Sequence, residues 1–532
     1  MIGNMTDMQT DDDALAVARE RVAALRASLE ASEGRPVRLV ETHISWVLLA
    51  DALAYKLKKP VRLPFLDFTT LAARRRFCEE ELRLNRRLAP ALYLDVVDVC
   101  DSPEGPRFGG GGRVLDTAVC MRRFPDGALW SEMLAAGSLA SRHIDAMAQR
   151  LSDFHRDVAV APPGSVFGSA AGHECATRRL IEGVEAWRAE VTPSGTDIDW
   201  LALRAWLDGQ QQALAPLWEQ RRRDGRVREC HGDLHLANVL QLAGEATAFD
   251  AIEFDAELRW IDVLDDIAFL AMDLLANGRR DLAFRFINAY LAASGDYDGL
   301  PVLRHGMVCR ALVRARVMAI GETQGVHSAA RCGAQDYLAL AAALACSADA
   351  RLAITHGLPG SGKSFTAQGV VEAAGAIGVR SDVERKRLFG LAARQSSHGH
   401  VPGGIYDQAA TQRTYSRLRE IATVALAAGW PVVVDAAFLL RSERTAFAAL
   451  AASLSVPFTV FDCQAEQPLL RQRLVQRQLG GVDASEADGA VLDRLTAVEE
   501  PLGAAERAVA IVVDAAQPVP PATLAQHWLA AG

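Results

Sequence analysis

A glycine-rich segment at residues 357–364 contains the residue types that bind phosphate. It reads GLPGSGKS and fits the pattern G-x-x-x-x-G-K-[ST], directly after an apolar run and before a stretch with helical spacing. Glycines let backbone N–H groups surround a phosphate, a lysine reaches the terminal phosphate oxygens, and a serine hydroxyl can ligate Mg²⁺. The pattern predicts a nucleotide site made by Gly357, Gly360, Ser361, Gly362, Lys363 and Ser364.

Acidic residues at two predicted strand ends could complete this site. Asp435 ends the apolar run 432–435, where a carboxylate can hold Mg²⁺ through water. Asp382 follows the run 377–380 and could accept the proton of a hydroxyl group, with Arg385 facing the same pocket three residues later. The alternative for Asp382 is an N-cap of the helix that begins there.

Two arginines further along have the spacing of a lid over the phosphates. Arg473 and Arg477 are four residues apart on a predicted helix, so both guanidinium groups point to one side. In phosphoryl transfer such groups offset the charge of the phosphates. The alternative is a solvent-exposed face of that helix.

A second set of residues lies between 231 and 250. The segment HGDLHLAN places Asp233 five residues before Asn238, the spacing of the H-R-D-x-x-x-x-N loop of kinases. A carboxylate near the attacking hydroxyl and an amide oxygen on Mg²⁺ are the groups that phosphoryl transfer uses. Asp250 ends the next apolar stretch and can offer the main Mg²⁺ carboxylate. We expect His231, His235 and Asp266 to stabilise this loop.

Lysines are scarce, and their positions are informative. Of 57 basic residues five are lysine, namely Lys56, Lys58, Lys59, Lys363 and Lys386. Lys56 lies in a β-prone run and is the candidate phosphate-binding lysine of the first half, with Glu81 in the next helix preferred to Glu79 or Glu80 as its partner. We interpret Lys58 and Lys59 as surface residues or fold-specific contacts, and Phe154 with His155 as packing residues.

Composition excludes several classes of protein. The net charge of −9 and the pI near 5.8 disfavour general DNA binding. The nine cysteines are spaced singly, the N-terminus is acidic, and no apolar run reaches the length of a membrane span. These features predict a soluble cytoplasmic protein with reduced thiols and no membrane partner.

The order of apolar patterns predicts several domains. Residues 1–35 contain a helical pattern, residues 36–125 alternate β-prone runs with a helix at 70–89, and residues 126–345 are mostly helical apart from 227–255. After a boundary at 346–350, apolar runs alternate with helical stretches from 351 to 532. That alternation is typical of a mostly parallel sheet covered by helices.

The C-terminal motifs resemble the P-loop kinase group that includes the 5′-kinase domain of phage polynucleotide kinase, gluconate kinase and chloramphenicol phosphotransferase. The resemblance covers about residues 352–479 and rests on the P-loop, the D-x-x-R of Asp382 and Arg385, and the R-x-x-x-R of Arg473 and Arg477. It implies that Asp382 is the general base, that Arg385 holds substrate or phosphate, and that the other two arginines form the lid. The acceptors of the group vary, so the resemblance implies a reaction type and no substrate.

The first half resembles the aminoglycoside phosphotransferase-like branch of the protein-kinase fold. The resemblance rests on the order of Lys56, a helix Glu, the HGDLHxxN loop and Asp250, and together with GLPGSGKS it is similar to a bacterial group of fused proteins. It implies a two-lobed domain over 36–345, with a small lobe at 36–125 and a large lobe at 126–345. No G-x-G-x-x-G is present, and the segment from Thr42 to Ser45 takes its place, so Ser45 is a candidate phosphate contact.

These patterns predict an α/β and α+β chain with two kinase-type sites that use ATP and Mg²⁺ to phosphorylate hydroxyl groups of small molecules. Three alternatives stay open: a kinase-like half that only regulates the P-loop half, a P-loop half that phosphorylates nucleic-acid 5′-hydroxyl ends, and antibiotic resistance. The even charge of residues 351–532, with 17 basic and 17 acidic side chains, weighs against nucleic acid. The sequence leaves the acceptors and the oligomeric state open, because residues 156–226 and 391–420 carry no readable motif.

Overall fold

The chain is described here by a computed structural model covering residues 9–10, 12–63, 66–190, 198–323, 332–347, 349–393, 395, 405–480 and 489–531. Contacts divide it into two compact units, residues 1–277 with 305–345 and residues 278–304 with 346–532. The predicted boundary at 346–350 lies at one junction, whereas 278–304, which the sequence pattern assigns to the first half, falls in the second unit. The limits of the domains stay a prediction.

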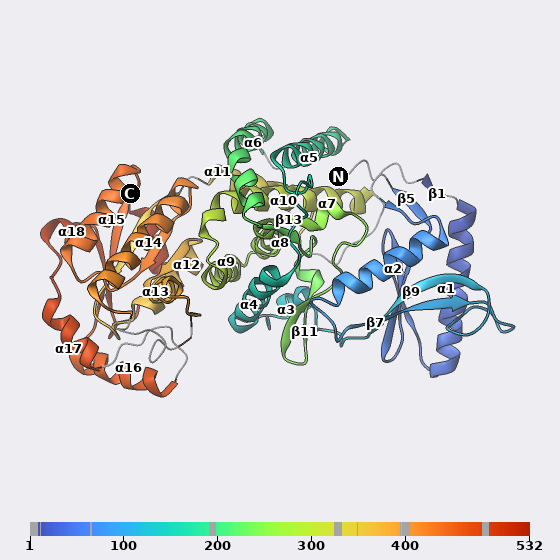
Figure 1. Cartoon of the computed structure of the whole chain (residues 1–532), viewed down its shortest axis with the longest axis horizontal. Helices are drawn as coiled ribbons and strands as arrows, with labels where there is room; N and C mark the ends of the chain where they lie inside the picture. Colours follow the sequence, from blue (N-terminus) through green and yellow to red (C-terminus); the bar gives the residue numbers. More distant parts are fainter. Residues whose placement is uncertain are drawn as a thin grey trace. The chain divides into compact units, whose positions relative to one another are not determined.

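The first unit begins with a six-stranded antiparallel sheet (Figure 1). The strands in spatial order are β2 (Arg38–Glu41), β3 (Ser45–Leu49), β4 (Leu53–Lys58), β9 (Val114–Arg122), β7 (Tyr93–Cys100) and β8 (Arg107–Phe108). A separate three-stranded sheet consists of β1 (Gln9–Thr10), β5 (Val61–Leu63) and β6 (Leu66–Asp67). The β-prone runs were predicted, and the segment between β7 and β9 contains β8.

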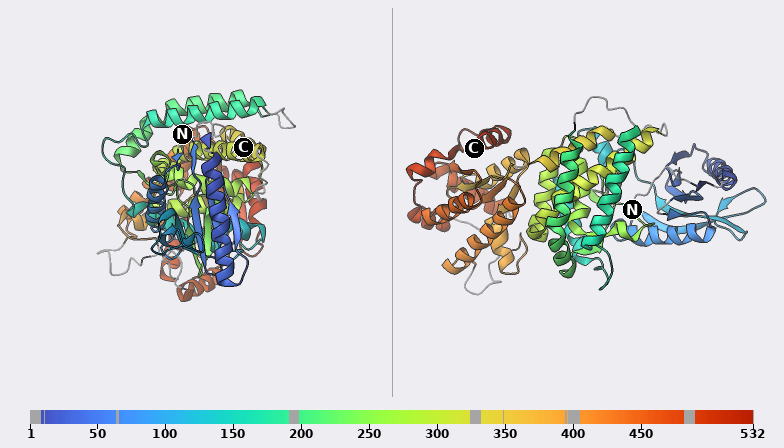
Figure 2. Two further views of the ribbon diagram at one scale, coloured as in Figure 1. Left: turned by 90° about the vertical axis from the view of Figure 1, so that its right-hand side faces the viewer. Right: turned by 90° about the horizontal axis from the view of Figure 1, so that it is seen from above.

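Two helices cover the two faces of the six-stranded sheet (Figure 2). Helix α1 (Asp12–Glu33) packs on a face that includes Trp46 and Leu57. Helix α2 (Leu71–Asn85) packs through Cys78 on the opposite face, with Ala54 and Val119. Because side chains alternate along a strand, β4 therefore offers every second residue to each helix.

Helices and two short antiparallel pairs of strands make up the rest of this unit. The strand pairs are β10 (Val227–Glu229) with β13 (Trp260–Asp262), and β11 (Val239–Leu242) with β12 (Glu245–Ala248). The helices are α3 (Trp130–Ala135), α4 (Ser141–Asp157), α5 (Ala170–Glu190), α6 (Trp200–Arg223), η1 (Leu236–Asn238), α7 (Ala256–Arg259), α8 (Val263–Ala276), α10 (Leu300–Thr323) and α11 (Ala334–Cys346). Nearly all residues of helix α8 are buried, as expected of a core helix. The division between the two units falls within α10.

The second unit contains a five-stranded sheet in which all strand pairs are parallel. Its spatial order is β15 (Ile377–Arg380), β16 (Val432–Asp435), β14 (Leu352–His356), β17 (Phe458–Gln464) and β18 (Ala510–Asp514). The predicted parallel sheet is confirmed. The helices of the unit are α9 (Arg280–Ser294), η2 (Tyr297–Gly299), α12 (Lys363–Ala374), α13 (Ser381–Leu388), α14 (Gln408–Ala427), α15 (Arg441–Ser453), α16 (Gln467–Gly480), α17 (Gly489–Val498), α18 (Ala504–Ala508) and α19 (Pro521–Ala530).

Both faces of the parallel sheet are buried, which explains its apolar runs. On one face α12 and α19 bury Ala353, Val433 and Trp528 in a single cluster. The alternate residues Leu352 and Val434 are also fully buried, and α14 and α15 contact β16 and β14. In such sheets ligand sites lie at the carboxyl ends of the strands. A ligand site is therefore expected at the carboxyl ends of β14, β15 and β16.

The helices within the described ranges do not include one that combines the length and the apolar composition needed to cross a membrane.

Candidate active sites

The P-loop connects β14 to α12 and requires glycine at two positions. Gly357 has a φ of 136°, and a Cβ added there would lie 2.4 Å from the carbonyl oxygen of Cys463. Gly360 has a φ of 88°, and its added Cβ would lie 3.0 Å from the carbonyl oxygen of Leu470. Side chains at these positions would displace backbone. The loop conformation therefore depends on the glycines that the motif predicted.

Lys363 and Ser364 begin α12, so the N-terminus of that helix faces the loop. The Lys363 ammonium donates to the carbonyl oxygen of Leu358 at 2.9 Å, which holds it over the loop. The hydroxyl of Ser361 is buried and has no hydrogen-bond partner among the described residues. This arrangement offers a positive charge and backbone donors to an anion.

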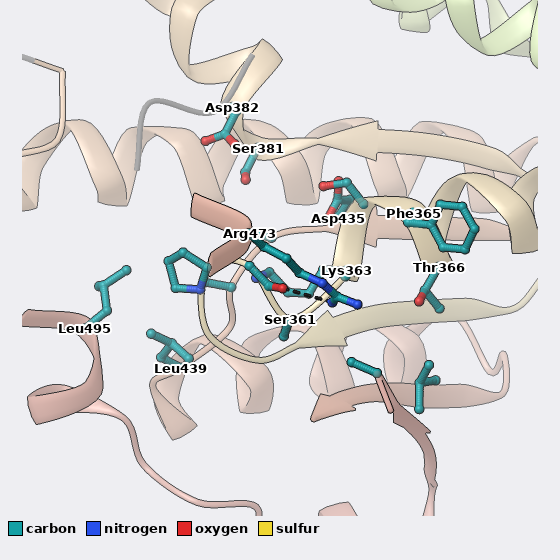
Figure 3. A pocket seen from close by; sticks show the side chains of 18 of the residues that line it. Ser361, Lys363, Phe365, Thr366, Ser381, Asp382, Asp435, Leu439, Arg473 and Leu495 are labelled. Carbon is teal, nitrogen blue, oxygen red and sulfur yellow. Dashed lines mark hydrogen bonds between the residues drawn. The ribbon is translucent and has the colours of Figure 1, made fainter. Parts of the chain in front are cut away.

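A cavity of about 1070 Å³ opens over the loop (Figure 3). Figure 3 shows Lys363, Asp435 and Arg473 together at the loop, with Ser381 and Asp382 at the start of α13 beyond them. The predicted site residues that line the cavity are Gly360, Ser361, Gly362, Lys363, Ser364, Asp382, Arg385, Asp435 and Arg473. Residues from four separate segments of sequence thus meet in one space.

Asp435 lies next to the loop because β16 is the neighbour of β14 in the sheet. Its side chain is buried, and Arg380 Nε lies 3.5 Å from its Oδ2 atom. The carboxylate of Asp435 and the hydroxyl of Ser364 are oxygen donors, the ligand type that Mg²⁺ prefers. The residues present at this site therefore fit the ion.

Asp382 and Arg385 are one turn apart on α13. The N-cap of this helix is Arg380, so the N-cap interpretation of Asp382 is wrong; Asp382 lies in the first turn, where negative charge is favourable. Arg385 is 7% exposed, and its Nη1 atom donates to the carbonyl oxygen of Ile405 at 3.1 Å and to Thr411 Oγ1 at 3.2 Å. Arg385 is thus fixed at the wall of the cavity.

The lid helix α16 carries Arg473 and Arg477. Arg473 Nη1 donates to the carbonyl oxygen of Gly360 at 3.1 Å, so one predicted lid arginine contacts the loop. Arg471, two residues earlier, pairs instead with Asp493 and is 52% exposed. The backbone of Arg477 belongs to α16, and its side chain lies outside the described residues.

Two residues of the cavity wall were not found from the sequence. Tyr415 accepts a hydrogen bond from the backbone N–H of Phe438 at 3.2 Å, and Glu443 lies next to Tyr415 in the first turn of α15. Burial raises the pKa of the Glu443 carboxyl above its ordinary value. Neither residue belongs to a motif, and Tyr415 lies in a stretch without readable chemistry.

In the first unit, the structure pairs Lys56 with Glu81. The Lys56 ammonium lies 2.9 Å from Glu81 Oε1 and also contacts Asp250 Oδ1. Glu80 pairs instead with Arg83 and Arg259. The predicted lysine, helix glutamate and metal-binding aspartate therefore lie together.

The loop after β10 brings Asp233 and Asn238 together. Asn238 Nδ2 donates to Asp233 Oδ2 at 3.1 Å and to the Asp233 carbonyl oxygen at 3.0 Å, which leaves the amide oxygen of Asn238 as an acceptor. Burial would raise the pKa of Asp233, but His235, with Nε2 at 3.4 Å, holds this pKa well below its usual range. Asp233 is thus an ionised carboxylate able to accept a proton.

Asp266 supports this loop from α8, as predicted. Its two oxygens accept from the backbone N–H groups of His231 at 3.1 Å and Gly232 at 2.8 Å, and His155 Nε2 lies 3.0 Å away. Burial would raise the pKa of Asp266, but His155, His231 and the Gly232 N–H together lower it to about 2. His155, which we interpreted as a packing residue, therefore also holds this carboxylate.

Asp250 follows β12 in a left-handed conformation with a φ of 63°. Its backbone N–H donates to the Tyr93 hydroxyl at 3.1 Å, and its side chain is 40% exposed. The Asp250 carboxylate and the amide oxygen of Asn238 are both oxygen donors, so they fit Mg²⁺. The backbone conformation is strained for a residue other than glycine, which is common at functional sites.

The two lysines at the end of β4 and directly after it are buried rather than exposed. Lys58 is 1% exposed and Lys59 is 8% exposed, so the surface interpretation is wrong and the fold-specific one holds. Lys59 pairs with Glu41 at 2.7 Å. Ser45 is also buried, and its hydroxyl has no hydrogen-bond partner among the described residues. Its role as a phosphate contact stays a prediction.

Comparison with known proteins decides the family. The chain is 32% identical over 458 residues to the uncharacterized protein Rv2004c of Mycobacterium tuberculosis, covering 85% of this chain and 88% of Rv2004c. The chain belongs to the Rv2004c family. The uncharacterized protein Mb2027c of Mycobacterium bovis matches to the same extent.

Other comparisons concern the two halves of this Rv2004c-family chain. A family model described as an AAA domain matches residues 352–502. Similar solved structures include a choline/ethanolamine kinase family protein from Mesorhizobium loti, with 12% identity and a TM-score of 0.37 over 62% of this chain and 93% of that one. A gluconokinase from Sinorhizobium meliloti has 22% identity and a TM-score of 0.24 over 34% and 91%. The residues matched by the AAA-domain model include the P-loop and strands β14 to β17 of the second unit.

Proposed function

We propose that the chain is an ATP- and Mg²⁺-dependent phosphotransferase with two kinase-type sites, each transferring the γ-phosphate to a hydroxyl group of a small molecule. The observation that carries the proposal is the cavity over the P-loop, which Lys363, Asp435, Asp382 and Arg473 all line. Phosphoryl transfer depends on positioning and electrostatic stabilisation, and these residues supply both.

In the P-loop site, the loop N–H groups and Lys363 hold the phosphates. Mg²⁺ bound by Ser364 and Asp435 would neutralise phosphate charge when present. Asp382 accepts the proton of the acceptor hydroxyl, because it lies in the first turn of α13 and lines the same cavity as the loop. Arg473 already contacts Gly360 and offsets charge as the phosphate moves.

In the kinase-like site, Asp233 accepts the acceptor proton and Lys56 binds phosphate oxygens. The ionised state of Asp233 and its distance of 3.1 Å from Asn238 support this assignment. Asn238 and Asp250 would hold Mg²⁺ through oxygen atoms. Both sites follow the same chemistry on unrelated folds, so a loss in one leaves the other intact.

The residues at the acceptor end of the P-loop cavity favour a small molecule as the phosphate acceptor. Arg385 and Glu443 place a cation and a carboxylate at the same wall, and Tyr406 and Thr411 also line it. A carboxylate there repels the phosphates of a nucleic-acid chain. Transfer of labelled γ-phosphate to 5′-hydroxyl oligonucleotides would contradict this choice of acceptor.

The cysteines support a cytoplasmic location. All nine lie within the described ranges and none forms a disulfide. Reduced thiols are typical of the cytoplasm, where ATP is available.

Single substitutions test the two-site proposal. We expect Lys363→Ala and Asp233→Ala each to remove one of two separable transfers of labelled γ-phosphate from ATP to a panel of hydroxylated small molecules. If Asp233→Ala leaves every transfer unchanged while the kinase-like half still binds ATP, that half is a regulatory module. If neither variant changes nucleotide binding or turnover, the proposal fails.

A further inference from the structure

Five charged side chains form a row of alternating sign in the kinase-like site. We define this charge row as Asp250, Lys56, Glu81, Lys58 and Glu253. Glu81 pairs through Oε1 with Lys56 at 2.9 Å and through Oε2 with Lys58 at 2.8 Å. Lys56 also contacts Asp250, and Lys58 also contacts Glu253. Each lysine of the charge row therefore bridges two carboxylates.

The fold places the two lysines side by side. They are two residues apart on β4, so their side chains lie on the same face of the sheet. That face packs on α2, which supplies Glu81. Glu253 follows Asp250 by three residues in the segment after β12. Lys58 thus connects one strand, one helix and the segment that carries the candidate metal ligand.

Burial separates the roles of the two lysines. The side chain of Lys58 is 1% exposed and that of Glu253 is 5% exposed, whereas Asp250 is 40% exposed. Lys58 is therefore enclosed by protein and does not reach the solvent-facing end of the charge row. Lys56, next to Asp250, is the lysine at that end.

The charges explain what Lys58 does for Lys56. Without Lys58, the buried carboxylates of Glu81 and Glu253 would have only Lys56 as a cation in the charge row, and a buried charge without a partner is costly. Lys56 would then be drawn inward, away from Asp250. We propose that Lys58 is a positioning residue of the kinase-like site, which neutralises Glu81 and Glu253 so that Lys56 stays directed toward Asp250 and the phosphates.

The inference rests on the proposed nucleotide site of this unit, and its test separates phosphate binding from general stability. The full chain carries Lys363→Met, so that only the kinase-like site reports. Calorimetry then measures the affinities for MgATP and for adenosine, which lacks phosphates. Into this parent we introduce Lys58→Met, and as a matched control Lys59→Met, because Lys59 is the adjacent buried lysine but pairs with Glu41 outside the charge row.

We expect Lys58→Met to weaken MgATP binding about tenfold, as loss of an outer-shell partner does at other sites, and to change adenosine binding less than about twofold. Lys59→Met should change neither affinity. Lys58→Arg should restore most of the MgATP affinity.

Other outcomes overturn the inference. An unchanged MgATP affinity in Lys58→Met, or an equal loss for MgATP and adenosine, shows that Lys58 does not position Lys56. If Lys58→Met does not fold, Lys58→Met with Glu253→Gln removes one charge of each sign and gives the same comparison. If the Lys363→Met parent binds no MgATP, the proposed function of this unit is contradicted. If the parent binds MgATP but Lys58→Met does not change the affinity, only the role of Lys58 is contradicted.

Discussion

The five lysines of the chain all have buried or half-buried side chains, although lysine is usually a surface residue. Lys56 and Lys58 each bridge two carboxylates, Lys59 pairs with Glu41, and Lys363 donates to the P-loop backbone. A lysine ammonium is a compact point charge on a flexible stem, which suits these enclosed contacts. The chain therefore keeps lysine where the geometry is specific.

The lid arginine gives a prediction about turnover. We expect Arg473→Met to lower kcat of the P-loop site about 10²-fold, because a donor to the transferring phosphate is lost. KM for ATP should change much less, since Lys363 and the loop still hold the phosphates. Steady-state kinetics with Arg471→Met as the control measures this, because Arg471 lies on the same helix and pairs with Asp493 instead. An equal loss in both variants would contradict the lid role.

Asp266 gives a prediction about stability and pH. Its pKa falls from 3.8 to about 2 on folding, which corresponds to about 2.5 kcal/mol of stabilisation. Because the folded pKa is the lower one, this stabilisation is present above about pH 4 and is lost as the pH falls toward 2. We expect Asp266→Asn to destabilise the first unit by about 3 kcal/mol at pH 7, since an amide group would face two backbone N–H donors.

Denaturant unfolding of wild type and Asp266→Asn across this pH range checks the argument. The difference in unfolding free energy between the two proteins should shrink as the pH falls from about 4 to 2. A difference that is constant over this range would show that the Asp266 charge contributes nothing to the loop.

At the scale of elements, the sequence predicted the parallel sheet and the P-loop well, because strands buried on both faces are apolar runs bounded by glycine and polar residues. It did not predict the partners of Lys58 or His155. Lys58 and Glu253 are separated by 195 positions in the chain, and His155 and Asp266 by 111. Local spacing carries no information about pairs that only the tertiary fold brings together, and the same holds for Tyr415 and Glu443.

The P-loop conformation gives a prediction at this scale. We expect Gly357→Ala to abolish nucleotide binding in the second unit and to cost at least about 2 kcal/mol of stability, because the new Cβ would lie 2.4 Å from the Cys463 carbonyl oxygen. Gly489→Ala is the matched control, since its added Cβ meets no atom of another described segment within 4 Å. Nucleotide binding by fluorescence and thermal unfolding measure both effects. Binding by Gly357→Ala as tight as in wild type would contradict the loop geometry.

At the scale of the whole molecule, the segment 278–304 groups with the P-loop unit. Asn288 of α9 donates to the carbonyl oxygen of Ala376 at 2.9 Å and accepts from the N–H of Gly378 at 2.7 Å, at the edge strand β15. Arg304 contacts the carbonyl oxygen of Ser347 and donates to that of Gly429 at 2.9 Å. No sequence pattern indicates this grouping, because α9 continues a run of helical patterns.

A fragment comparison tests the grouping. We expect a fragment of residues 351–532 to unfold at a lower temperature than one in which 278–304 is joined to 346–532 by a short Gly/Ser linker. The contact of Arg304 with Ser347 shows that such a linker can span the junction. Asn288→Ala should remove part of the gain, since it deletes both bonds to the edge strand. Equal stability of the two fragments would contradict the assignment of 278–304 to this unit.

The central claim is that one chain carries two nucleotide sites, and the stoichiometry of MgATP binding tests it most directly. Calorimetry on the full chain should give two MgATP bound per chain in wild type, one in Lys363→Met, one in Lys56→Met and none when both substitutions are combined. One MgATP bound per wild-type chain would contradict the account. In that case one of the two substitutions would abolish binding and the other would leave it unchanged.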